Sequence, residues 1–162
     1  MADMELLLKR LIEYDTEFVV VGGFAAMAYG VTLVTHDIDI CFRFSEENLM
    51  RLQSALQDLN PVHRMTPKRL PLELTPGQCA SLTNLYLSTD WGQLDCLGNI
   101  TGLGDFDAVR IESMEIELDF GICRIATVDA LIKVKLAMSR PRDKEAVFQL
   151  QAIKERIEDR KG

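Results

Sequence analysis

Two aspartates separated by one residue are the feature of this sequence most suited to chemistry. Asp37 and Asp39 lie in the segment 37–44, in which every second residue is apolar, namely Ile38, Ile40, Phe42 and Phe44. Because successive side chains of a strand point to opposite faces, both carboxylates are predicted to share one face. Carboxylates in this arrangement are typical ligands of magnesium or manganese rather than zinc.

Paired carboxylates of this kind indicate phosphoryl transfer. Two metal ions about 3.5 to 4 Å apart can hold the attacking and leaving oxygens of an in-line displacement at phosphorus. Asp95 is our candidate for a third acid that fixes the second ion, because the segment 91–97 is predicted to be a strand beside 37–44. The alternative is that Asp37 and Asp39 form only the solvated face of an amphipathic strand.

The residues before the aspartates predict a strand, a glycine turn and a helix. Residues 18–21 are apolar and largely β-branched, which is typical of a buried strand. Gly22 and Gly23 then allow a tight turn and a close approach of the backbone to a ligand. A short helix over 24–29 follows, and Gly30 ends it.

The rest of the chain supplies elements that position these residues. Apolar spacing predicts a helix over 4–14, and Ser45 begins another that ends at Asn60. Residues 63–77 are predicted to form an irregular loop with a short strand at 72–74. This loop contains Arg64, Lys68 and Arg69, which either hold phosphates or are simply solvated.

The second half predicts two hairpins and two helices. The first hairpin pairs 82–88 with 91–97, and 98–104 is a plain connection. The second pairs 110–118 with 122–126. Thr127 begins a helix to 139, and the last helix, over 142–159, has Val147, Leu150, Ile153 and Ile157 directed inward. These elements predict an α/β (α+β) fold: a mixed β-sheet flanked by helices, with a helical C-terminus.

Length and composition favour one soluble domain over residues 1–162. The chain is 48% apolar and 27% charged, with 18 basic and 25 acidic residues and a net charge of −7. This charge argues against binding nucleic acid mainly by phosphate neutralisation. The first residues resemble neither a signal peptide nor a membrane span, so we predict a cytoplasmic protein without membrane contact. The four cysteines have no paired spacing and are predicted to be reduced and mostly buried.

Three segments resemble a known family. GGFAAMAYGVTLVTHDIDICF (22–42) resembles the signature of the nucleotidyltransferase superfamily of DNA polymerase beta, in which Gly-Gly or Gly-Ser, a short helix and an acid-apolar-acid strand follow an apolar residue. QLDCL, with Asp95, resembles the third carboxylate strand. ATVDALIKVKLAMSRPRDKEAVFQL (126–150) resembles the C-terminal segment of the small bacterial AbiEii-like branch.

The resemblance implies a nucleotidyltransferase fold and transfer of a nucleoside monophosphate from a nucleoside triphosphate (NTP). It implies that Asp37 and Asp39 bind two Mg²⁺ or Mn²⁺ ions, and that Asp95 completes one site and accepts a proton from the attacking hydroxyl. Nucleotide-binding roles fall on five residues, namely Gly22, Gly23, Thr35, Lys135 and Arg140. Lys133 is an alternative to Lys135. Arg140 can equally form a structural ion pair with Asp143. Thr35 can instead form hydrogen bonds with the backbone of the turn or serve only as a strand-entry residue.

The sequence also departs from the family pattern. Many relatives have an arginine two residues before the threonine that precedes the acids, whereas this chain has Leu33. The chain also lacks the large extra domain with which many members hold their acceptor, so the acceptor is open between RNA, protein and a small molecule. The resemblance also implies a possible role in a toxin–antitoxin pair with an antitoxin partner. The alternative function is a catalytically inactive binding or regulatory module with the same fold.

Overall fold

The structure is built around two short antiparallel strands. Every residue of β1 (Phe18–Val21) is buried, as expected for an apolar run rich in β-branched residues. β2 (Asp37–Phe42) pairs with it so that Val21 lies opposite Asp39. The computed structural model describes residues 3–33 and 35–161. Both predicted strands are confirmed, although β2 ends at Phe42 rather than at residue 44.

Five more strands complete a mixed sheet around this pair. The order across the sheet is β3-β4-β5-β2-β1-β9-β8. β2 runs parallel to β5 and β1 runs parallel to β9, whereas the other neighbours are antiparallel. The added strands are β3 (Val62–His63), β4 (Asn84–Thr89), β5 (Gly92–Leu97), β8 (Ser113–Leu118) and β9 (Gly121–Ala126). A separate two-stranded ladder consists of β6 (Asn99–Ile100) and β7 (Gly104–Asp105).

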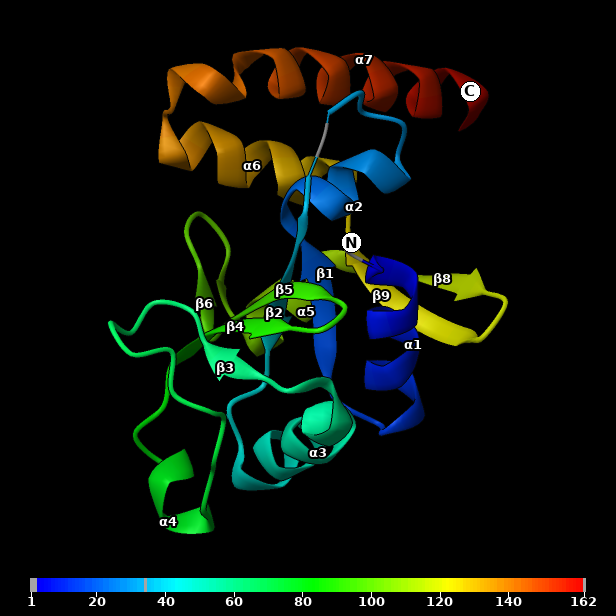
Figure 1. Ribbon diagram of the computed structural model, residues 1–162. Coiled ribbons are helices and arrows are strands. Elements are labelled where there is room, and N and C mark those ends of the chain that lie inside the picture. The colour runs from blue at the N-terminus through cyan, green and yellow to red at the C-terminus, as the bar shows by residue number, and fades with distance from the viewer. Residues whose placement is uncertain (1–2, 34, 162) are drawn as a thin grey trace.

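Helices pack around the sheet and extend beyond one of its ends. They are α1 (Met4–Glu13), α2 (Gly22–Ala28), α3 (Glu46–Leu56), α4 (Pro76–Cys79), α5 (Phe106–Ile111), α6 (Val128–Met138) and α7 (Lys144–Lys161), with 3-10 turns at Gln57–Leu59 and Pro141–Asp143. In Figure 1, α6 and α7 form a layer above the end of the sheet where β1 runs into α2. The predicted mixed α/β architecture with a helical C-terminus is thus confirmed. Within the described residues, no helix is long and apolar enough to cross a membrane.

Side-chain caps fix where several helices begin. The Ser45 side chain accepts a hydrogen bond from the backbone N–H of Asn48, and Thr127 accepts one from Ala130, as their positions in the sequence predict. Asp105 caps α5 in the same way. These bonds satisfy amides that have no partner within the helix.

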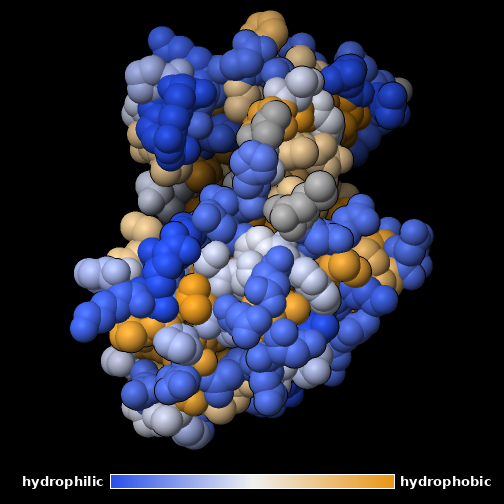
Figure 2. Space-filling view, in the orientation of Figure 1, coloured by the Kyte–Doolittle hydropathy of each residue, from blue (hydrophilic) through white to orange (hydrophobic). Residues whose placement is uncertain are grey.

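The core contains most of the side chains that apolar spacing selects. Leu49, Leu52, Leu56 and Leu59, which repeat at helical spacing, are all buried. The four free cysteines are buried too, as predicted. In α7, Leu150 and Ile153 are buried, but Ile157 is 36% exposed. Ile157 is therefore not a core residue as predicted, although it lines a cavity with Tyr29 and Val128 at the start of α6. The face drawn in Figure 2 is mainly hydrophilic, with small separate apolar patches.

Several connecting segments differ from their predicted structures. No strand forms at 72–74; the short edge strand is β3, and α4 follows within the predicted loop. The predicted plain connection at 98–104 contains β6 and the first residue of β7. The predicted strand start at residue 110 lies in α5, and β8 begins at Ser113. These elements are too short to be stable alone, so their tertiary contacts determine them and the local pattern does not.

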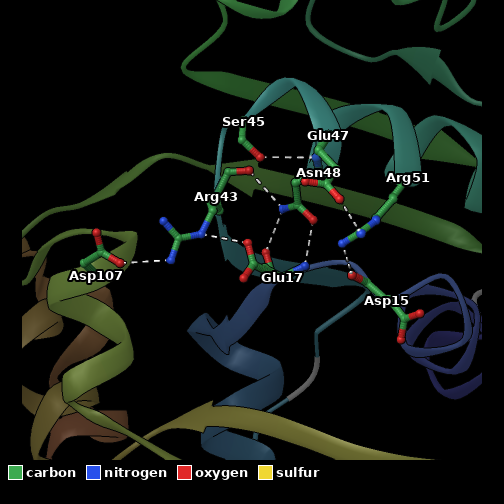
Figure 3. A network of polar contacts seen from close by, with 8 residues as sticks. All are labelled: Asp15, Glu17, Arg43, Ser45, Glu47, Asn48, Arg51 and Asp107. Atoms are coloured by element: carbon green, nitrogen blue, oxygen red, sulfur yellow. Dashed lines mark hydrogen bonds and ion pairs between the residues drawn. The ribbon is translucent and has the colours of Figure 1, made fainter.

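A buried asparagine joins α3 to the strands. Asn48 is 1% exposed. Its side-chain oxygen accepts from the N–H of Glu17 at 2.7 Å, and its nitrogen donates to the carbonyls of Glu17 and Arg43 at 2.9 Å each. Figure 3 shows Asn48 at the centre of this network. The asparagine thus satisfies backbone groups where the chain enters β1 and leaves β2.

We predict that Asn48→Leu lowers the free energy of unfolding by about 1 to 3 kcal/mol, because leucine has similar size but leaves the N–H of Glu17 without a partner and removes one of the two hydrogen bonds accepted by each of the carbonyls of Glu17 and Arg43. Urea unfolding followed by circular dichroism measures the change. Gln57→Ala, at an exposed position just after α3, is the matched control and should change stability by less than about 0.5 kcal/mol. Equal effects of the two variants would contradict a structural role for the Asn48 network.

Candidate functional site

The parallel pairing of β2 with β5 places two of the predicted acids next to each other. Asp39 lies opposite Asp95, and Asp37 lies opposite Gln93. Residues paired in this way direct their side chains to the same side of a sheet. The predicted position of the Asp95 strand beside β2 is therefore confirmed, and Asp37, Asp39 and Asp95 form one carboxylate cluster at the centre of the sheet.

Gly22 is packed directly against this cluster. It is the first residue of α2, so the helix begins at residue 22 rather than at the predicted residue 24, and the positive φ of Gly22 makes the predicted tight turn at the end of β1. Gly22 has a φ of +69°, and a Cβ atom there would stand 2.5 Å from Oδ2 of Asp39. Only glycine permits both this backbone conformation and this close approach.

Gly23 and Thr35 lie beside the cluster under weaker constraints. A Cβ atom on Gly23 would stand 3.4 Å from Cβ of Thr35 and 3.5 Å from Cδ1 of Leu33, which leaves it only slightly crowded. The Thr35 hydroxyl donates to the carbonyl of Asp37 at 3.2 Å and also accepts from its N–H at 3.4 Å. Thr35 thus makes the backbone bonds that were one of its predicted alternatives.

Arg64 is the residue of the site whose role the sequence did not reveal. Its guanidinium group binds both oxygens of Asp95, at 2.7 and 3.0 Å. The side chains of Arg64 and Asp95 are only 16% and 12% exposed. A bidentate pair of this kind is strong and fixes the orientation of the carboxylate. The only sequence signal was the position of Arg64 in a basic loop, which did not indicate its partner.

Burial and nearby negative charge raise the pKa values of Asp39 and Asp95. Desolvation is the main cause for Asp39, and the charge of Asp37 adds to it. For Asp95, burial raises the pKa to about 6; Arg64 opposes this shift, while the charges of Asp39 and Asp37 reinforce it. The site therefore disfavours a full set of ionised carboxylates unless a positive charge is nearby.

A cavity of about 370 Å³ opens beside the carboxylate cluster. Five predicted site residues line it, namely Gly22, Gly23, Asp39, Lys135 and Arg140. Tyr86, Asn84 and Asn99 contribute to the lining on the side of β4 and β6. Thr35, Asp37 and Asp95 are not part of the lining, so the predicted residues divide between the cavity wall and the cluster behind it.

The two cationic residues of the wall share one buried partner. Asp143 is 7% exposed and accepts from Arg140 Nε at 2.6 Å and from Lys135 Nζ at 3.3 Å. Burial opposes its ionisation, but hydrogen bonds and charges from Arg140 and Lys135 outweigh burial and lower the pKa of Asp143. The predicted ion pair of Arg140 with Asp143 is confirmed. The alternative cation Lys133 pairs with Glu112 and does not line the cavity.

The site fits a divalent cation only in part. Asp37 and Asp39 offer hard oxygen ligands, and within the described residues neither forms an ion pair with lysine or arginine. Asp95 differs because Arg64 already binds both of its oxygens. Across residues 3–33 and 35–161, no three histidine, cysteine, aspartate or glutamate side chains are grouped so as to hold a metal ion.

Comparison with models of protein families gave no match, and comparison with curated proteins gave none either.

We predict that Gly22→Ala displaces the Asp39 carboxylate and lowers stability by more than the cost of about 1 to 2 kcal/mol for a left-handed alanine. The ¹³C chemical shift of the Asp39 carboxyl group and urea unfolding measure the two effects. Gly30→Ala is the matched control, because Gly30 also has a positive φ, of +104°, but its Cβ would meet nothing within 4 Å. An unchanged Asp39 signal in Gly22→Ala would contradict the contact.

We also predict that Arg64→Gln destabilises the protein more at pH 8 than at pH 5. The pKa of Asp95 is higher in the folded state than in the unfolded state, so protonated Asp95 favours folding. This contribution to stability is complete at a pH below the pKa of the unfolded state and is lost as the pH rises through about 6. Removing Arg64 raises the pKa of folded Asp95 further, so the stability lost between low and high pH becomes larger. Urea unfolding at both pH values measures the difference. Lys68→Gln is the control, since Lys68 forms no ion pair within the described residues, and an equal effect of Arg64→Gln at both pH values would refute the prediction.

Proposed function

We propose that this protein is a metal-dependent nucleotidyltransferase that moves a nucleoside monophosphate from an NTP to an acceptor. The observation that carries this proposal is the pairing of Asp39 with Asp95 across β2 and β5, with Gly22 pressed against Asp39. A structural sheet gains nothing from adjacent carboxylates at its centre, whereas phosphoryl transfer requires them. The resemblance of the sequence to the nucleotidyltransferase superfamily supports the same conclusion.

Asp37 and Asp39 are the residues that would hold Mg²⁺ or Mn²⁺. Once bound, such an ion would supply positive charge to the phosphate oxygens. The predicted second ion would need Asp95, whose oxygens already bind Arg64, so the arrangement does not fit it. The pKa of Asp95, about 6, suits a group that takes a proton from an attacking hydroxyl.

The cavity beside the cluster suits the triphosphate. Lys135 and Arg140 line its wall and together carry one positive charge more than their shared partner Asp143. This excess attracts an anion to the side of the cavity formed by α6. Gly22 and Gly23 allow close approach of a phosphate to the backbone, and Thr35 holds the turn that leads into Asp37.

The acceptor stays open between RNA, protein and a small molecule. The net charge of −7 makes a large nucleic-acid footprint unfavourable, but it does not exclude a single terminal nucleotide in the cavity. The resemblance to the AbiEii-like branch supports a cytoplasmic enzyme of a toxin–antitoxin pair, with an antitoxin as the protein partner.

A second candidate function is a binding or regulatory module without catalysis. The specific observation in its favour is the bidentate pair of Arg64 with Asp95, which occupies the acid expected to act in the reaction. Leu33, where many relatives have arginine, removes one cation from the predicted phosphate site. Such a module would bind nucleotide but transfer nothing.

The deciding experiment uses each of the four NTPs, labelled at the α-phosphate, with Mg²⁺ or Mn²⁺ and cell extract. We predict transfer of label to a component of the extract, reduced at least about 100-fold in Asp39→Asn because a metal ligand is lost. Asp119→Asn, in the exposed turn between β8 and β9, is the control and should transfer normally. If no NTP gives transfer while calorimetry detects nucleotide binding, the binding module replaces the enzyme as the function.

A further inference from the structure

The position of Arg64 follows from a row of residues across the sheet. The N–H of Arg64 donates to the carbonyl of Tyr86 at 2.8 Å, immediately after β3. Tyr86 lies opposite Asp95 in the β4–β5 pair, and Asp95 lies opposite Asp39 in the β5–β2 pair. The row therefore runs Arg64, Tyr86, Asp95, Asp39, and all four side chains are on one side of the sheet.

The backbone around Arg64 is fixed from several directions. The N–H of His63 donates to the carbonyl of Leu70 at 2.8 Å, and that of Leu72 donates to Pro61 at 2.9 Å. The Gln53 side chain, from α3, donates to the carbonyl of Leu74 at 3.2 Å. The guanidinium carbon also lies 5.9 Å from the centre of the Tyr86 ring. Arg64 is therefore held in a fixed position in the site and differs from a mobile cation on the surface.

The charge of the cluster then determines how many cations it can bind. Asp37, Asp39 and Asp95 carry three negative charges when ionised, and Arg64 contributes one positive charge at 2.7 Å from Asp95. One divalent ion balances the remaining charge. A second ion on Asp95 would lie next to the guanidinium group, where repulsion between the two cations opposes its binding.

We propose that Arg64 takes the place of a second metal ion, so that the site binds one divalent cation, at Asp37 and Asp39. This inference rests on the proposed function, because it concerns the same carboxylates. Arg64 acts as a positioning residue: it keeps Asp95 ionised, oriented and free of metal. Arginine suits this role because its charge is permanent and its planar fork matches both carboxylate oxygens.

The test counts Mn²⁺ ions bound to the full chain, using electron paramagnetic resonance of the free ion and calorimetry with Mn²⁺ alone. We predict one ion per chain for the wild type and two for Arg64→Met, which keeps an unbranched side chain in place of the aliphatic part of arginine but removes the guanidinium group and its charge. Lys68→Met, on the same loop, is the matched control and should bind one ion. Arg64→Lys, which retains the charge, should also bind one.

Two aspartate variants keep the inference testable if Arg64→Met fails to fold. We expect Asp95→Asn to bind one ion with its dissociation constant changed less than about threefold, and Asp39→Asn to bind at least about tenfold more weakly. Two ions on the wild type, or a single ion whose binding requires Asp95, would overturn the role of Arg64 and leave the proposed function intact. No ion on the folded wild type would overturn the metal site and therefore both proposals.

Discussion

The burial of neighbouring carboxylates, Asp39 and Asp95 with Asp37 beside them, is the constraint on which the rest of the site depends. The parallel pairing of β2 with β5 places Asp39 and Asp95 next to each other. Burial is the main cause that raises both pKa values, and the charge of Asp37 adds to it in each case. Such a pair is tolerated only if cations are near. Arg64 meets this need directly, and Lys135 contributes a more distant charge that favours ionisation of Asp39. The loop around Arg64 and the α6 segment that carries Lys135 therefore both supply positive charge that favours the ionised form of the buried carboxylates.

Much of the fold could be predicted because its signals are local. The β-branched run of β1 and the alternation of β2 each decide a strand within a few residues. Ser45 and Thr127 begin helices through their own side chains, and the leucine spacing of α3 selects its buried face. In these places, sequence pattern and tertiary structure require the same residue. The position of Asp95 beside β2 is different: it is predicted from the need for a third acid and from the resemblance of QLDCL to a third carboxylate strand, and the structure confirms it.

The remaining features depend on contacts between residues far apart in the chain. Arg64 and Asp95 are 31 positions apart, and no local pattern relates them. The two adjacent glycines look equivalent in the sequence, yet only Gly22 is required by the Asp39 carboxylate. α5 has a capping aspartate but only 6 residues, too few for apolar periodicity to separate it from the strand that follows. The exposure of Ile157 likewise depends on its surroundings at the start of α6, which are distant in the sequence.

The charges on the two sides of the cavity favour a functional interpretation of the site over a purely structural one. On the sheet side, three acids share a single arginine; on the helical side, Lys135 and Arg140 share a single acid, Asp143. Neither group is balanced alone, and each lies near the cavity with charge of opposite sign in excess. A structure selected only for stability would pair these charges or replace them with apolar residues. A ligand that brings a cation to the acids and an anion to the bases would balance both groups at once. A metal-bound nucleoside triphosphate has this distribution of charge, which is why the proposed function accounts for the helical side of the cavity as well as for the aspartates.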